Sequence, residues 1–182
     1  SRIGDDPNQW LSDYLLSNKA DGLLLFDGSL DTKRLHGLDE HSVSLPLVAA
    51  YDEPPDPEIH SVLTDNRSAA KRIVRYLHGI GHRDIGHIIG PSRNKSTNER
   101  FLGFQDAMNE LGLAIRQPWL FQGTYQMPSG AEAADHFLKA DRLPTAVFAG
   151  NDEMAIGLIR RLHEHGVECP RDISVVGYDD IA

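Results

Sequence analysis

Short apolar runs alternate along the chain with segments in which apolar residues recur every three or four positions. Four of these runs, at 23–26, 85–89, 145–149 and 173–176, hardly alternate between apolar and polar residues, and a weaker run covers 46–50. Unbroken apolar runs of this length are typical of strands that are buried on both faces of a parallel sheet. The runs therefore predict strands of that kind.

Helical spacing occupies most of the chain between the runs. Asp65 or Asn66 is a candidate cap for one predicted helix, and Gly112 and Gly166 are placed to end two others. Strands and helices that alternate at this spacing predict βαβ units, and so an α/β fold with mostly parallel, doubly wound sheets. The apolar stripes of the predicted helices begin at Trp10 (for an opening helix that reaches about Lys19), Ala69, Phe101, Ala131 and Met154.

A cluster of prolines and acidic residues at 52–58 marks the one boundary visible in the sequence. Proline lacks a backbone donor and fixes φ, so this segment continues neither a helix nor a central strand. We expect residues 1–60 to form a partial N-terminal subdomain and residues 61–182 to form most of a C-terminal one. The chain starts at Ser1 and stops at Ala182, directly after an expected core strand, so we expect it to be a fragment.

Charge and cysteine content narrow the function classes. The 27 acidic and 18 basic residues give a formal net charge of −9, which argues against nucleic-acid binding, since neutralising phosphates takes clustered Lys and Arg. No run approaches the ~20 apolar residues of a membrane span, and the first residues do not resemble a signal peptide. Cys169 is the single cysteine, and we expect it to be a small buried thiol rather than a nucleophile.

Polar segments follow the predicted strands and are the candidates for ligand binding, because ligands of open parallel sheets bind outside the carboxyl ends of the strands. Asn94 and Arg100 offer donors and Asp152 offers an acceptor, as the hydroxyl groups of a polyhydroxylated ligand require. The same residue types commonly begin helices. Capping therefore remains the alternative for each of them taken singly.

The familiar cofactor, metal and catalytic motifs are not met. Gly79-Ile80-Gly81 fails as a dinucleotide fingerprint, because it precedes its strand and Asp84 stands where the third glycine is needed. The histidine pairs at 78 and 82 and at 163 and 165 are expected to be solvated or capping residues rather than zinc ligands. There is no Ser-His-Asp or Gly-x-Ser-x-Gly arrangement. We expect a binding protein with no cofactor, metal or catalytic activity.

The motifs of this chain resemble a known family. Asp65-Asn66 and the segments 81–90, 100–104, 144–149, 151–157 and 170–181 resemble, in family order, the ligand-binding core of LacI/GalR-type bacterial transcription regulators. The resemblance runs from about residue 8 to the end, and the final Pro-Arg-Asp-Ile-Ser-Val-Val-Gly-Tyr-Asp-Asp-Ile is among the most specific motifs. It implies a periplasmic-binding-protein-like fold, with two doubly wound subdomains and an effector in the cleft between them, the N-terminal subdomain being incomplete here.

The resemblance also implies site residues. Arg100 matches the arginine that grips the effector, and Asp152 matches the aspartate that binds effector hydroxyls or amines. Asn94 and Ser96 match effector contacts of the long loop, and Tyr125 matches an aromatic residue. Tyr51, with Asp52 beside it, stands where the family has an acidic or polar residue, so this sequence departs from the family pattern in the N-terminal half of the pocket. Phe26 is a further aromatic candidate, for which we expect plain core packing.

The function implied is that of an effector-sensing domain. The effector is expected to be a small molecule, namely a sugar, a sugar phosphate, a nucleoside or a purine. Its binding would control, allosterically, the DNA binding of an N-terminal helix-turn-helix that these residues do not include. We expect a cytoplasmic homodimer without membrane contact. The alternative is a periplasmic solute-binding protein of a sugar transporter, which has the same fold.

Overall fold

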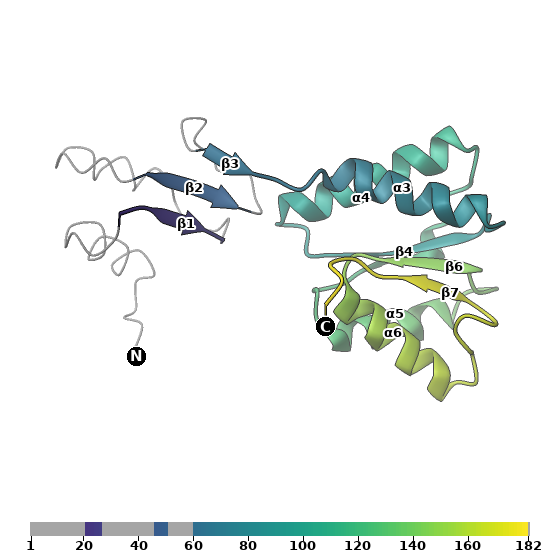
Figure 1. Cartoon of the computed structure of the whole chain (residues 1–182). Helices are drawn as coiled ribbons and strands as arrows, with labels where there is room; N and C mark the ends of the chain where they lie inside the picture. Colours follow the sequence, from purple (N-terminus) through teal and green to yellow (C-terminus); the bar gives the residue numbers. More distant parts are fainter. Residues whose placement is uncertain (1–20, 27–45, 51–59, 182) are drawn as a thin grey trace. The chain divides into compact units, whose positions relative to one another are not determined.

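The computed structural model describes residues 21–26, 46–50 and 60–181, and it divides the chain into two units, 1–64 and 65–182 (Figure 1). The described part of each unit holds one parallel sheet. The division falls a few residues after the predicted boundary between 60 and 61. The reason is that β3 (His60–Val62) pairs with β2 (Leu47–Ala50) and so belongs to the first sheet.

The first sheet has the order β1-β2-β3, with β1 at Leu23–Leu25. Apolar runs predicted β1 and β2, but β3 was not predicted, because its three residues are all exposed and carry no apolar pattern. Phe26, which follows the edge strand β1, is 68% exposed, so the expectation that it packs in a core is wrong. The predicted opening helix, the cluster at 52–58 and Tyr51 lie outside the described residues.

The second sheet has the order β5-β4-β6-β7, and all its strands run parallel. The central strands β4 (Ile85–Ile89) and β6 (Ala146–Ala149) are almost wholly buried, which confirms the prediction from unbroken apolar runs. The edge strand β7 (Ser174–Val176) is only partly buried. The other edge strand, β5 (Leu120–Gln122), was not predicted, because it is a three-residue strand directly after the short 3-10 helix η2 (Gln117–Trp119).

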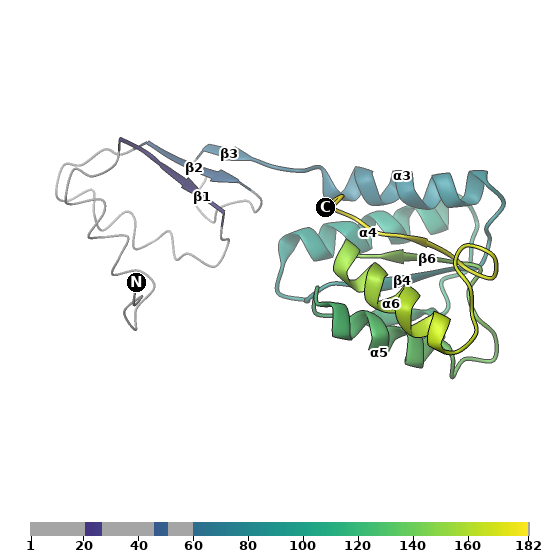
Figure 2. The ribbon, with the colours of Figure 1, turned by 60° about the horizontal axis from the view of Figure 1, so that its bottom comes forward.

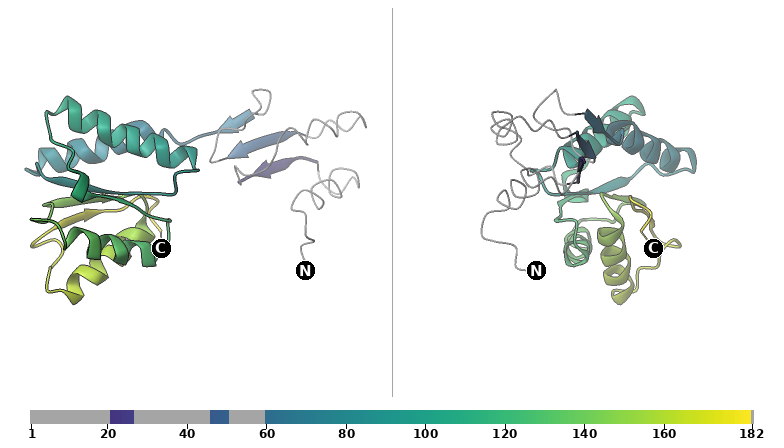
Figure 3. Two further views of the ribbon diagram at one scale, coloured as in Figure 1. Left: turned by 180° about the vertical axis from the view of Figure 1, so that it is seen from behind. Right: turned by 60° about the vertical axis from the view of Figure 1, so that its left-hand side comes forward.

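Helices cover both faces of this second sheet, as a doubly wound arrangement requires. The helices α3 (Asn66–Gly79) and α4 (Lys95–Glu110) lie on one face, and α5 (Met127–Phe137) and α6 (Asp152–Glu164) lie on the other (Figures 2 and 3). The predicted helix boundaries are confirmed at the start of α3 and at the ends of α4 and α6, where a capping side chain or a glycine sets them. The Asp65 carboxylate caps α3 by accepting from Ser68 N at 3.0 Å, and Gly112 and Gly166 adopt φ of +66° and +77° after α4 and α6.

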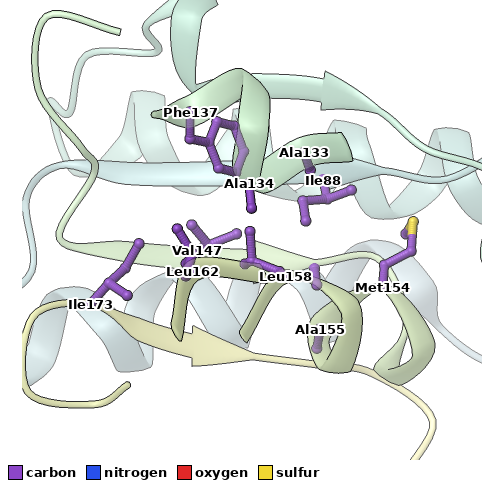
Figure 4. Packing of buried hydrophobic residues seen from close by; sticks show 11 residues of the cluster. Ile88, Ala133, Ala134, Phe137, Val147, Met154, Ala155, Leu158, Leu162 and Ile173 are labelled. Carbon is purple, nitrogen blue, oxygen red and sulfur yellow. The ribbon is translucent and has the colours of Figure 1, made fainter. Parts of the chain in front are cut away.

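Apolar side chains from α5, α6 and the sheet form one core cluster (Figure 4). Ile88 and Val147 point from β4 and β6 toward residues such as Phe137 of α5 and Leu158 of α6. The two helices approach closely through glycines. A Cβ at Gly157 of α6 would lie 2.0 Å from the carbonyl oxygen of Met127 in α5. Close packing of this pair therefore depends on glycine at that position.

The opposite face of the sheet contains a buried histidine that the sequence analysis did not single out. His87 is 1% exposed, and its ring stacks between Phe104 and Phe148, with centroid distances of 4.9 and 4.6 Å. Its Nδ1 lies 2.7 Å from the carbonyl oxygen of Phe148. Burial disfavours the charged imidazolium and lowers the pKa of His87 to about 4. His87 is therefore a neutral core residue near neutral pH.

Two further expectations are tested outside the core. Cys169 is partly exposed in the segment between α6 and β7, so the prediction of a buried thiol is wrong. His82 is partly exposed, and its two ring nitrogens lie 3.0 Å from Thr145 Oγ1 and 3.1 Å from Ser174 Oγ, so it is more than the solvated or capping residue that was expected. It joins the end of α3 to the beginnings of β6 and β7. None of the described helices is long and apolar enough to cross a membrane.

Candidate functional site

Arg100 lies at the carboxyl edge of the second sheet, in the second turn of α4. Its side chain is held from several directions and is almost wholly buried. Nε donates to Asn66 Oδ1 at 2.8 Å, and Nη1 donates to the carbonyl oxygen of Gly150, which follows β6. Nη2 lies 3.6 Å from Asp179 Oδ1. Within the described part of the chain, this last nitrogen is paired by charge without a hydrogen bond.

Tyr178 stacks on the guanidinium of Arg100. The guanidinium carbon lies 3.7 Å from the centre of the tyrosine ring, which is the geometry of a cation–π contact. The Tyr178 hydroxyl donates to Asn66 Oδ1 at 3.1 Å, so that Arg100 and Tyr178 share one acceptor. Burial raises the pKa of Tyr178 above its ordinary value, and the hydroxyl therefore keeps its proton.

Asp179 is the carboxylate that faces Arg100 among the described residues, and its backbone is strained. Its φ is +111° and that of Asp180 is +59°, in a region that residues with a side chain rarely adopt. Strain of this kind persists only where the surroundings hold it, and it gathers at functional sites. Burial raises the pKa of Asp179, repulsion from Asp152 adds to the rise, and attraction to Arg100 opposes it. This carboxylate therefore lies between a positive and a negative neighbour.

Asp152 begins α6 and is bound to the segment that carries Asp179. Its backbone N donates to the Tyr178 carbonyl at 2.9 Å, and its Oδ2 accepts from Ile181 N at 3.0 Å. A Cβ at Gly177 would lie 1.9 Å from Asp152 Oδ1, so the absence of a side chain at Gly177 makes room for the Asp152 carboxylate in its present position. Much of the bonding of Asp152 thus goes to holding residues 177–181.

Tyr125 follows β5 and enters the same edge of the sheet. Its φ is +66°, and its hydroxyl lies 2.6 Å from Thr97 Oγ1. The ring occupies the space above Gly90, where a Cβ would lie 2.2 Å from the Tyr125 ring carbon Cζ. The guanidinium carbon of Arg100 lies 5.8 Å from the ring centre. The structure therefore brings Arg100 and Asp152 to one edge, as their positions after strands led us to expect, and it brings Tyr125, which only the resemblance had indicated, to the same edge.

Asn94 and Ser96 lie at the beginning of α4, on the same edge. Asn94 occupies the capping position, but its side chain makes no capping hydrogen bond, unlike Asp65 at α3 and Asn151 at α6. The capping alternative is therefore wrong for Asn94 as far as its side chain is concerned. Ser96 is 8% exposed in the first turn. Tyr51 lies outside the described residues, and so its predicted place in the site remains a prediction.

Asn66, Tyr178 and Asp179 were not predicted as ligand-binding residues, although Tyr178 and Asp179 follow the predicted strand at 173–176 and so belong to the strand-end edge. All three lie in segments that carry the family resemblance, and this was the signal that they have a role in the family's fold or site. The strand spacing did not show that Tyr178 and Arg100 would share the Asn66 side chain, because Tyr178 and Asn66 are separated by 112 residues along the chain. Among the described residues, no group of three or more His, Cys, Asp and Glu is placed to hold a metal ion.

Comparison with known proteins shows which family has this fold. Residues 74–182 match the family model described as a periplasmic binding protein-like domain. The PurR repressor of Pasteurella multocida, a helix-turn-helix type regulator, is 36% identical over 170 residues, which cover 93% of this chain and 50% of that protein. This chain belongs to the LacI/GalR family. The periplasmic-binding-protein-like fold expected from the sequence is thereby confirmed.

Solved structures of transcriptional regulators agree with this membership. A sugar-binding regulator of this family from Escherichia coli, complexed with phosphate, has a TM-score of 0.82 and 29% identity, over 96% of this chain and 63% of its own. The regulator CelR, in complex with cellobiose, has a TM-score of 0.79 and 30% identity, over 95% of this chain and 53% of its own. The chain spans about half the length of the curated relatives it matches. It is LacI/GalR effector-binding core, and the relatives are named as repressors rather than enzymes.

Proposed function

We propose that this chain senses a neutral, polyhydroxylated small molecule, a sugar or a nucleoside, at the edge formed by Arg100, Asp179 and Asp152. One observation carries the proposal. Asp179 Oδ1 and Arg100 Nη2 lie 3.6 Å apart, beyond an ordinary hydrogen bond. A ligand hydroxyl between them accepts from the guanidinium and donates to the carboxylate, which uses both capacities of a hydroxyl group.

The charges at this edge favour a neutral ligand over an anionic one. Arg100 already faces Asp179, and Asp152 adds a second carboxylate close to the same segment. A phosphate or carboxylate group would have to approach two negative charges for one positive charge. Tyr125 adds an aromatic surface beside the guanidinium, and the apolar face of a sugar or base packs well on such a ring.

We further propose that ligand binding regulates DNA binding by a helix-turn-helix elsewhere in the full-length protein, which acts as a homodimer. Residues 1–60 and 61–182 would then contribute to two subdomains, and the ligand would favour one of their arrangements. Such control requires that the ligand bind one arrangement more tightly than the other. The support is the family membership and the repressor names of the relatives.

Calorimetry on the full-length protein tests the ligand class with two probes, cellobiose and inorganic phosphate. We expect the sugar to bind and phosphate not to compete with it. Asp179→Asn keeps the shape but removes the charge, and it should weaken sugar binding by roughly 10-fold or more, the equivalent of ~1.5–3 kcal/mol for a hydrogen bond to a charged group. The matched control is Asp106→Asn. Asp106 is on the same helix as Arg100, and the substitution breaks its exposed ion pair with Arg67 of α3.

Two results would contradict the proposal. The first is tighter binding of phosphate than of cellobiose and other uncharged sugars or nucleosides. The second is equal sugar affinity in Asp179→Asn and Asp106→Asn, which would remove Asp179 from the site. We also expect Asp179→Asn to improve any weak binding of phosphate, because it removes a negative charge beside Arg100.

A further inference from the structure

Asn66 is a buried polar residue that helix formation does not explain. It is the first residue of α3 and is 7% exposed. The capping of this helix is already provided by Asp65, whose carboxylate accepts from Ser68 N. Asparagine is a poor helix former, and a buried amide must find hydrogen-bond partners or destabilise the fold. The position of Asn66 therefore calls for another reason.

That reason lies in the two donors that meet its side-chain oxygen. Arg100 Nε and the Tyr178 hydroxyl donate to Asn66 Oδ1 at 2.8 and 3.1 Å, and the Tyr178 ring stacks on the guanidinium. Asn66 thus fixes the edge of the guanidinium, Tyr178 fixes its plane, and the Gly150 carbonyl holds Nη1. Only Nη2 is left to face Asp179, so its direction is set by these partners.

Asn66 also has a particular place along the chain. The first unit ends at Thr64 and the second begins at Asp65, so Asn66 is the second residue after the chain passes from one unit to the other. A hydrogen bond from Arg100 to this residue connects the ligand edge directly to that passage. Any ligand that displaces the Arg100 side chain therefore also displaces Asn66 in the first turn of α3.

We propose that Asn66 is a positioning residue for the ligand site. It aims Nη2 of Arg100 at the ligand without touching the ligand, and it transmits occupancy of the site to the passage between the two units. The inference rests on the proposed function for its ligand part. The aiming of Arg100 is a property of the unliganded chain and is tested without a ligand.

Nitrogen NMR of the Arg100 Nε–H, assigned with Arg100→Lys, tests the aiming. In Asn66→Leu the acceptor is lost, and we expect exchange of this proton with water to accelerate by about 10-fold or more, in line with loss of one charge-assisted hydrogen bond. In Asn66→Asp the acceptor becomes charged at nearly the same shape, so the Nε–H signal should move downfield while protection stays. The matched control is Asp65→Ala, which weakens the same helix end but should leave the Arg100 signal in place.

The outcomes separate positioning from a merely structural role. An unchanged Arg100 signal in Asn66→Asp would overturn the proposal, and this variant serves even if Asn66→Leu fails to fold. Loss of protection in Asp65→Ala equal to that in Asn66→Leu would also overturn it, because the effect would then come from fraying of α3.

Hydrogen exchange with and without cellobiose tests the transmission. The backbone amides of Ser68 and Ala69, which bond to Asp65 in the first turn of α3, should exchange more slowly when the sugar is bound. Asn66→Leu should abolish that slowing, and Asn66→Asp should restore it. Equal slowing in wild type and Asn66→Leu would overturn the transmission. If wild type binds no cellobiose, the proposed ligand class fails, whereas the signal of Arg100 still decides the role of Asn66.

Discussion

Replacing Gly157 with alanine should destabilise the second unit, although alanine is the better helix former. The added Cβ would lie 2.0 Å from the Met127 carbonyl oxygen and 3.2 Å from Ala131 N. Both atoms belong to the backbone of α5, so the clash is relieved only when the two helices separate. Separation loosens the core cluster to which Leu158 and Ala134 contribute.

The two opposing effects have known sizes. Overpacking costs about 1–3 kcal/mol and sometimes more, and a carbonyl contact this short belongs at the upper end. Gly→Ala inside a helix contributes about 1 kcal/mol in the other direction. The net loss is then about 2 kcal/mol, which lowers the urea midpoint by about 1 M when the denaturant slope is about 2 kcal/mol/M.

Urea unfolding followed by circular dichroism measures the effect, and Gly79→Ala is the matched control. Gly79 is the last residue of α3, and a Cβ there meets nothing within 4 Å. We expect that variant to be as stable as wild type or more stable, by up to about 1 kcal/mol. If Gly157→Ala matches or exceeds the wild-type midpoint, the close approach of α5 and α6 through Gly157 is not as described.

Three further predictions concern buried groups. The pKa of His87 is about 4 in the fold and about 6.5 when unfolded, so the stability should be full above pH 6.5 and decline by about 3 kcal/mol as the pH falls to 4. The difference between the urea midpoints at pH 7 and pH 4.5 should be smaller in His87→Gln than in wild type, and an equal difference would contradict the assignment. Asn151→Ala should cost about 2 kcal/mol in urea unfolding, because it removes a cap and leaves the Tyr125 carbonyl without its donor; a loss no larger than that of Asp65→Ala, a cap alone, would argue against the second bond. Gly90→Ala should displace the Tyr125 ring, and the free energy of cellobiose binding should then fall by more than the free energy of unfolding from urea titration. Unaltered affinity for cellobiose would exclude that ring from the site.

Local chemistry made most of the second unit predictable from its sequence. In α6, most of the predicted apolar stripe is buried, namely Met154, Ala155, Leu158 and Leu162, whereas Ile159 is 37% exposed, and the helix ends before Gly166. Such patterns are read within a few residues of each other and need no knowledge of the rest of the fold. The strand β3 shows the limit, because an exposed three-residue strand carries no pattern and is defined only by its pairing with β2.

In the candidate site, too, some residues could be predicted from the sequence and others could not. Arg100 and Asp152 were selected because residues after parallel strands meet at one edge, a rule of topology that holds wherever the strands are recognised. Their partners depend on how distant segments close upon one another. Asn66 and Arg100 are 34 residues apart, and nothing in the spacing indicated that one amide oxygen would serve both Arg100 and Tyr178. The strained φ of Asp179 is likewise a product of that closure.

The hydrogen bond between Asn66 and Tyr178 has a consequence for how the protein is made. It joins residues that are 112 positions apart, and α3, α4, α5 and α6 all precede Tyr178 along the chain. On the ribosome, Arg100 is therefore synthesised long before its stacking partner and its counter-charge. A chain cut short before β7 would retain all four of these helices, but its Arg100 would lack both partners. The contacts that fix the Arg100 side chain are therefore completed only after 112 further residues have followed Asn66.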